Sequence, residues 1–222
     1  LFSDNESAAT APGFYAIDVP PPIVLQGVSS GYLGIVFQGE WGPDGVVGEP
    51  TGTPAFLDTY FPSGCPRTST GYRALMRRRL PLRPVRVVGS TAAASTATIA
   101  GTGGNLTATA KYKGTVGNSI SITISGSGST RDITVRLRDA AGRQTEEIYT
   151  AIPLPSGGNA VTVDVSRSKL LASMVLASTM TAFPANGTTT MSAGSNGSVG
   201  SAEYEAALAL LAARKDVGVV CV

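Results

Sequence analysis

Residues 119–137 read SISITISGSGSTRDITVRL, two runs of alternating apolar and polar side chains on either side of a Ser-Gly repeat. Successive side chains of a β-strand point to opposite faces, so Ile120, Ile122 and Ile124 share one face. The run from Ile133 to Leu137 alternates in the same way. Because Gly and Ser favour turns, residues 125–129 are expected to form a loop. The stretch predicts an antiparallel hairpin with one buried and one wet face.

The same character extends from about Ser90 to Met191, where Ser, Thr and Gly dominate. Alternating runs recur at Leu106-Ala108-Ala110 and Val161-Val163-Val165, and Ala141-Gly142 predicts a second hairpin loop. We therefore expect residues 91–191 to form a β-rich, mainly antiparallel domain.

The segments on both sides of this domain follow a different pattern. Residues 33–37 and 217–222 are apolar runs, typical of strands buried on both faces, and residues 85–88 are expected to form another strand. Thr53-Pro54 predicts a helix over 53–61 with Thr53 as its N-cap, and a second helix is expected over 72–80.

A last helix is expected over 202–214, capped by Ser201 and burying a stripe of Tyr204, Ala207, Leu208 and Leu211. These strands and helices predict the fold class α/β (α+β mixed). In this arrangement an α/β sheet domain, formed by residues 28–90 and 192–222, is interrupted by the β-rich insertion.

The first 27 residues have the features of an extended arm. Phe14 to Val19 alternate, with Tyr15, Ile17 and Val19 on one face, and three prolines at 20–22 end the strand. A lone strand followed by prolines has no local partner, so it is an edge strand or adds to the sheet of another chain. We expect Phe14, Tyr15, Ile17 and Val19 to contact a neighbouring subunit.

Composition excludes several kinds of chemistry. The 222 residues are 42% hydrophobic and 14% charged and contain no histidine, which removes Ser-His-Asp, Cys-His and His-ligated zinc sites. The two cysteines, Cys65 and Cys221, form no disulfide framework or thiolate metal site. We expect Cys65 to be exposed, Cys221 to lie in the core, and the protein to use no metal or cofactor.

Charge is segregated along the chain. Residues 1–58 contain seven acids and no base, whereas residues 59–131 contain ten bases and no acid. Three explanations remain open: pairing within the chain, a basic surface for nucleic acid or anionic lipid, and head-to-tail contacts between subunits. The residues of a candidate charged interface are Arg73, Arg77, Arg78, Arg79, Arg83, Asp18, Glu40, Asp44 and Glu49.

Motifs that invite a catalytic interpretation are weak. The Gly-rich residues 194–200 precede a helix, where phosphate can bind, but they lack the GK[ST] ending of a P-loop. Glu146 and Glu147 are consecutive on an expected strand and so point to opposite faces. The apolar stretch 170–183 is too short to span a bilayer. No catalytic, cofactor-binding or metal-binding residue is predicted.

Four motifs in order resemble the contractile tail sheath proteins of bacteriophages and related injection machines. They are Pro12-Gly13-Phe14-Tyr15; Gly27-Val28-Ser29-Ser30 with Gly42-Pro43; residues 106–110 followed by Gly114, Gly117 and Asn118; and Ala193 to Gly197 before Tyr204 and Ala207-Leu208. Glu40-Trp41-Gly42-Pro43 departs from the family's Arg-Gly-Pro, and Asn196 replaces an Asp.

The resemblance implies a non-enzymatic structural subunit that self-associates as stacked six-fold rings around an inner tube. Extended arms would link the subunits, with the α/β domain facing inward and the insertion outside. It implies the tube, baseplate and tail terminator proteins as partners, without nucleic acid or membrane insertion. It also implies a location in the virion tail after assembly in the bacterial cytoplasm.

Two other functions stay open on the sequence alone: a β-rich adhesin or glycan-binding module, and a nucleotide-binding α/β enzyme. The chain starts at Leu1 and stops inside an apolar run. We therefore expect it to be a piece of a longer protein.

Overall fold

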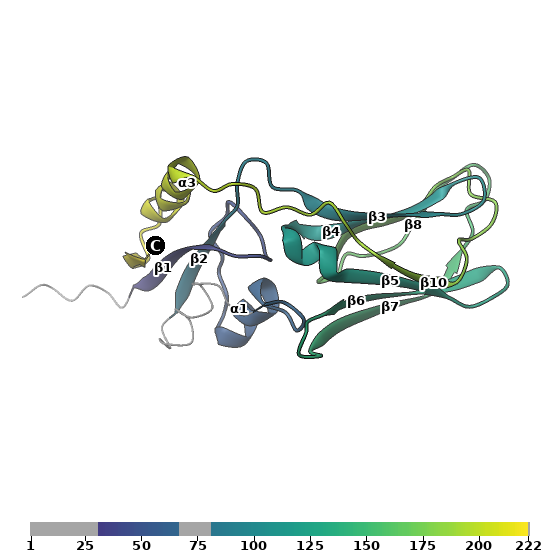
Figure 1. Cartoon of the computed structure of the whole chain (residues 1–222). Coiled ribbons are helices and arrows are strands. Elements are labelled where there is room, and N and C mark those ends of the chain that lie inside the picture. Colours follow the sequence, from purple (N-terminus) through teal and green to yellow (C-terminus); the bar gives the residue numbers. More distant parts are fainter. Residues whose placement is uncertain (1–30, 67–80, 222) are drawn as a thin grey trace, which may run out of the picture. The chain divides into compact units, whose positions relative to one another are not determined.

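The computed structural model describes residues 31–66 and 81–221. Strands predominate, arranged as one three-stranded sheet and two four-stranded sheets (Figure 1). The described α-helices are α1 (Thr53–Tyr60) and α3 (Ser201–Ala212). The expected class α/β is therefore corrected for the described residues to a mostly β fold with two antiparallel sheets and one parallel sheet, because strands account for far more of these residues than the two short helices do.

The three-stranded sheet is parallel and joins distant parts of the chain. Its order is β11 (Val217–Cys221), β1 (Tyr32–Gln38) and β2 (Leu82–Val87). Val36 packs with Val85, Ala207 and Leu211 beneath α3. The alternate side chains of β1, such as Ile35 and Phe37, belong to the core that includes the buried residues of α1. Both faces of β1 are thus covered, as its continuous apolar sequence predicts.

The other two sheets are antiparallel. One has the order β3 (Ala94–Ala100), β4 (Asn105–Lys113), β9 (Leu171–Leu176) and β8 (Val161–Thr162). The second has the order β10 (Gly187–Thr190), β5 (Ile120–Ser125), β6 (Thr130–Arg138) and β7 (Gln144–Pro153). A 3-10 helix, η2 (Thr115–Ser119), connects β4 to β5. The inward side chains of both sheets share one core, which includes Leu106, Ile122, Val135 and Met174.

Two connecting segments carry the chain into and out of the antiparallel sheets. Ala93 and Ser195 form a β-bridge, as do Thr96 and Ser192, so the outgoing and returning segments pair with each other. At Gly194 the returning segment lies close to the backbone of Gly114, because a Cβ at this position would lie 2.4 Å from the carbonyl oxygen of Gly114. Only a residue without a side chain fits there.

Most of the predicted elements are confirmed. The hairpin of β5 and β6 pairs Ile122 with Val135, and Gly142 has φ 81° in the turn before β7. The predicted buried stripe of α3 is also observed, with Ala207 and Leu211 buried and Tyr204 and Leu208 packed beside them. The strand expected over 161–165 is shorter, since pairing in β8 stops at Thr162.

Four local predictions are wrong. Helix α1 is capped by Gly52, and helix α3 by Gly200, so Thr53 and Ser201 already lie inside their helices. Cys65 is fully buried rather than exposed, with its Sγ 3.9 Å from the carbonyl oxygen of Tyr60. Val220, expected in a fully buried strand, is 40% exposed because β11 is at the edge of the described sheet. The expected arm and the helix over 72–80 lie outside the described residues.

Candidate assembly surface

A buried arginine joins the parallel sheet to the antiparallel sheets. Arg86, on β2, has no exposed surface. Its Nε and Nη1 donate to the carbonyl oxygens of Gly39 and Gly42, each at 2.7 Å, and its Nη2 donates to the carbonyl of Lys113 at 2.8 Å. Gly39 and Gly42 follow β1, whereas Lys113 ends β4. One guanidinium therefore holds backbone from two sheets.

Arg86 remains charged in this position. Burial lowers its pKa to about 10, and the nearby Asp44 carboxylate, 4.0 Å away, acts in the opposite direction. Asp44 also pairs with Lys113 at 3.2 Å. At neutral pH the guanidinium is protonated, so all three hydrogen bonds to carbonyl oxygens are charge-assisted.

Aromatic side chains pack beside this junction. Phe37 of β1 contacts Tyr60 edge-on, with ring centroids 5.5 Å apart, and Trp41 contacts Tyr112 of β4 in the same manner at 5.3 Å. Burial raises the pKa of Tyr60 to about 12. Such aromatic pairs contribute about 0.5–1.5 kcal/mol beyond the area they bury. They therefore add rigidity where the loops after β1 meet the antiparallel sheets.

A second charged network surrounds the start of the parallel strands. The guanidinium of Arg83 pairs with Asp216 at 2.8 Å and stacks 3.7 Å from the centre of the Tyr32 ring. Arg214 pairs with Asp216 at 3.1 Å and with Glu49 at 2.6 Å. These groups link β2, the start of β11 and the loop before α1. Hydrogen bonds from Arg214 and Arg83 lower the pKa of Asp216 to about 2.

The lowered pKa of Asp216 makes the stability of the fold depend on pH. In an unfolded chain an Asp titrates near a pKa of about 3.9. Its contribution is therefore complete above about pH 4 and is lost as the pH falls toward 2. We expect Asp216→Asn to reduce the loss of stability between pH 4.5 and pH 2.5, measured as the shift of the urea midpoint. An equal shift in the variant and the native sequence would contradict this role.

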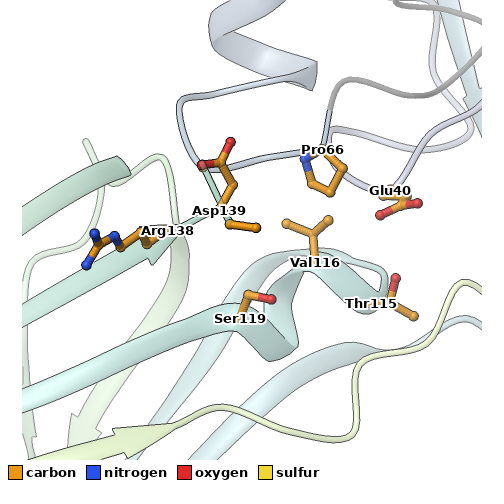
Figure 2. Close-up of a pocket in the computed structure, with 9 residues that line it drawn as sticks. Glu40, Pro66, Thr115, Val116, Ser119, Arg138 and Asp139 are labelled. Atoms are coloured by element: carbon orange, nitrogen blue, oxygen red, sulfur yellow. The ribbon is translucent and has the colours of Figure 1, made fainter. Parts of the chain in front are cut away.

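A pocket of about 300 Å³ lies near the segments that Arg86 holds together, between Glu40 and η2 (Figure 2). Glu40 and Pro66 face Thr115, Val116 and Ser119 of η2 across it, and Arg138 and Asp139 lie at the end of β6. Asp139 accepts a hydrogen bond from Arg143 Nε at 2.7 Å. The carboxylate is thus already paired, and we interpret the pocket as a crevice between elements.

The Gly-rich segment before α3 has a structural role in the fold. Asn118 donates to the carbonyl of Gly194 at 3.0 Å and accepts from its N–H at 2.8 Å. Asn196 accepts from the Thr115 N–H at 3.3 Å, and the Glu203 carboxylate accepts from the Gly200 N–H at 2.9 Å. Several of the polar groups that a phosphate would require are therefore bonded within the chain.

The candidate interface residues are only partly described. Arg83 is 9% exposed and bonded to Asp216. Asp44 and Glu49 form ion pairs within the chain, and Glu40 lines the pocket of Figure 2. For Asp44, the pair with Lys113 agrees with the first of the three explanations of the charge segregation, pairing within the chain. The residues outside the described ranges are Phe14, Tyr15, Ile17, Val19, Asp18, Arg73, Arg77, Arg78 and Arg79.

The sequence patterns do not single out two residues that are important in the structure. Arg86 is one of the ten bases of residues 59–131, and Asp216 belongs to none of the motifs. A signal for Arg86 was present, because it lies between Val85 and Val87 in an apolar strand, where a charge needs buried partners. Asp216 carried no comparable signal, since its partners are distant in sequence.

Searches of the described residues for two other kinds of site gave no candidate. Residues 31–66 and 81–221 hold no cluster of three or more side chains suited to bind a metal ion. Within the same ranges, neither helix has the length and apolar character required to cross a bilayer.

Comparison with known proteins gives matches at the level of structure. No protein-family model matches the chain, and a search of curated proteins finds none that matches. A solved sheath tail protein from Listeria innocua matches with a TM-score of 0.57 and 18% identity, covering 84% of this chain and 39% of that protein. A sheath tail protein from Desulfitobacterium hafniense matches with a TM-score of 0.56 and 17% identity, covering 94% and 45%.

This chain thus spans less than half the length of either structural neighbour. At this level of identity the likeness concerns the fold. The resemblance to contractile tail sheath proteins, predicted from four sequence motifs, is confirmed in the fold of the chain.

Proposed function

We propose that this chain is part of a structural, non-enzymatic subunit of a contractile phage tail sheath. The observation that carries the proposal is the shared fold with two sheath tail proteins over 84% and 94% of the chain. The subunits self-assemble as stacked six-fold rings around an inner tube, and they meet baseplate and terminator proteins at the two ends. Assembly takes place in the bacterial cytoplasm, with no nucleic acid or membrane insertion required.

The proposed domain organisation has three parts. Residues 1–27 are the arm, residues 28–90 with 192–222 form the sheet domain, and residues 91–191 form the insertion. The pairing of β1 with both β2 and β11 supports this division, because residues far apart in sequence meet in one sheet. The bridge between Ala93 and Ser195, which lie close to the two proposed boundaries at 91 and 191, also supports it.

The arm is proposed to add a strand to the sheet of a neighbouring subunit. Such an addition requires a sheet edge with unpaired backbone groups. Among the described strands β11 pairs only with β1, and its Val220 is 40% exposed. This edge is therefore a suitable acceptor, and Tyr15, Ile17 and Val19 are the arm side chains expected to be buried.

Substitutions in the arm test this role. Changing Tyr15 and Ile17 to Asp places two charges on the face expected to be buried. We therefore expect most of the assemblies that sediment rapidly to be lost. The matched control is Ala16→Asp, on the face that already carries Asp18. Sedimentation velocity measures both variants. Equal loss in the control, or normal assembly of the double variant, would contradict a face-specific strand addition.

The basic segment is proposed to contribute contacts between rings or neighbouring subunits. Replacing Arg77, Arg78 and Arg79 with Ala is expected to weaken assembly and reduce its sensitivity to salt, while circular dichroism shows a folded monomer. Each exposed ion pair contributes only about 0–1 kcal/mol, so the effect depends on many copies acting together. Assembly with an unchanged salt dependence would count against the charged interface.

Contraction on this proposal requires no nucleotide. An extended lattice and a compact lattice differ in the free energy of their subunit contacts, and the transition proceeds to the more stable one. Contacts that are individually weak supply the work because they are repeated in every subunit. The charged segments suit heterologous contacts, which continue along a lattice rather than closing a dimer.

A further inference from the structure

The sequence contains two Asn-Gly pairs in different parts of the fold. Asn186-Gly187 lies at the start of β10, and Asn196-Gly197 lies in the Gly-rich segment before α3. Asn-Gly pairs are prone to deamidation, in which the glycine backbone nitrogen attacks the asparagine side-chain amide. Glycine permits this attack because it has no side chain to hinder its nitrogen and its backbone rotates freely. The reactivity of each pair therefore depends on how firmly the fold holds it.

Asn196 and Gly197 are held firmly. The Asn196 side chain accepts from the Thr115 N–H at 3.3 Å and donates to the Thr115 hydroxyl at 3.4 Å. The Gly197 N–H, which carries the attacking nitrogen, donates to Ser195 Oγ at 3.1 Å. A Cβ built on Gly197 would lie 3.0 Å from the Cα of Gly89, so this turn is closely packed. The rotation that brings nitrogen and side-chain amide together is therefore blocked.

Asn186 and Gly187 are held less firmly. Both residues are exposed, and no atom lies within 4 Å of a Cβ built on Gly187. The Asn186 side chain donates to the carbonyl oxygen of Gly126 at 2.9 Å, a contact at the surface. Gly187 pairs with Ile124 at the end of an edge strand, where pairing opens most easily. Opening this one terminal pair frees the nitrogen of Gly187.

We propose that Asn186 is a site of spontaneous deamidation in the folded protein, whereas Asn196 is protected. The Gly187 nitrogen forms a bond to Asn186 Cγ, and the bond between Cγ and Nδ2 breaks. The amide nitrogen leaves as ammonia with the proton of the Gly187 N–H. Water then opens the resulting succinimide at either carbonyl and gives aspartate or isoaspartate. The reaction takes place within one chain and does not depend on the proposed function.

The surroundings of Asn186 can accommodate the new negative charge. The loop that Asn186 contacts also borders Arg131, since a Cβ built on Gly126 would lie 3.9 Å from Arg131 Cδ. The Arg131 guanidinium stacks 4.9 Å from the centre of the Phe183 ring. Its Nε is buried and has no hydrogen-bond partner among the described residues. A cation with an unused donor thus lies near the product carboxylate.

Peptide mapping by mass spectrometry tests the proposal on the folded protein during incubation in mildly alkaline buffer. Alkaline conditions favour the reaction because the attacking backbone nitrogen must lose its proton. We expect Asn186 to convert at least about tenfold faster than Asn196, because more hydrogen bonds and a packed turn must open at Asn196. Equal rates, faster conversion of Asn196, or no conversion at either residue would overturn the proposal.

Two controls separate the effect of the fold from that of the local sequence. In the urea-unfolded chain the two pairs should convert at similar rates, and a preference for Asn186 that persists there would overturn the structural explanation. Gly187→Ala adds a Cβ beside the attacking nitrogen, in space that is open in the fold. We expect this variant to lose most of the product at Asn186 and to keep the native urea midpoint. Unchanged conversion would contradict attack by the residue 187 nitrogen.

Discussion

Replacement of Arg86 by Met lowers the free energy of unfolding by about 3 kcal/mol, the largest effect we expect from an arginine. The substitution leaves the carbonyl oxygens of Gly39, Gly42 and Lys113 without the donor that now satisfies them. Each buried acceptor left unsatisfied costs about 1–3 kcal/mol. Removing the buried charge offsets part of this loss, because its desolvation no longer opposes folding. Urea unfolding followed by tryptophan fluorescence, through Trp41 beside the junction, measures the change.

Arg86→Lys and Arg136→Met complete this experiment. A lysine keeps the charge but lacks the planar fork, so we expect it to recover only part of the stability. Arg136 has a side chain that is 42% exposed and pairs with Glu146, so Arg136→Met should change stability by less than about 1 kcal/mol. If Arg86→Met and Arg136→Met are equally stable, the guanidinium does not hold the two sheets together.

Gly194→Ala is expected to destabilise the chain by about 3 kcal/mol. A Cβ at this position would lie 2.0 Å from Ser95 Oγ and 2.4 Å from the Gly114 carbonyl oxygen, so the returning segment must move. Overpacking of this kind costs about 1–3 kcal/mol. The movement also weakens the two hydrogen bonds with Asn118, each of which contributes about 1 kcal/mol.

Gly187→Ala is the matched control, because no atom lies within 4 Å of a Cβ built there and the residue is exposed in β10. We expect its stability to equal or slightly exceed that of the native sequence, since Ala has less freedom to lose on folding. Similar midpoints for Gly194→Ala and Gly187→Ala in thermal or urea unfolding would show that the connecting segments are not tightly packed.

The antiparallel sheets were predictable because their signal is local. The isoleucines of β5 and the Ser-Gly loop after them fix the strand, its buried face and its turn within one short stretch. Strand β9 shows no such alternation, because a shift of register beside Ala110 places both Leu171 and Met174, three residues apart, in the core. The class α/β fits the parallel sheet and its two helices, but it does not describe the whole of the described structure, because most of the strands belong to the two antiparallel sheets.

The charged groups were less predictable because their partners are distant in sequence. Counting residues revealed the segregation of acids and bases but not that Arg83 pairs with Asp216, which is 133 residues away. Cys65 follows a glycine in a loop, yet it is buried under side chains that no local pattern brings together. Periodicity identifies which face of an element is apolar, whereas ion pairs between elements depend on the tertiary arrangement.

Negative-stain electron microscopy of the protein, purified with and without residues 1–22, tests the central claim most directly. The sheath function predicts long hollow cylinders with six-fold end views for the intact protein and their disappearance when the arm is removed. Cylinders that survive the truncation would retain the sheath and reject the role of the arm. Monodisperse monomers in both preparations would contradict the sheath function itself.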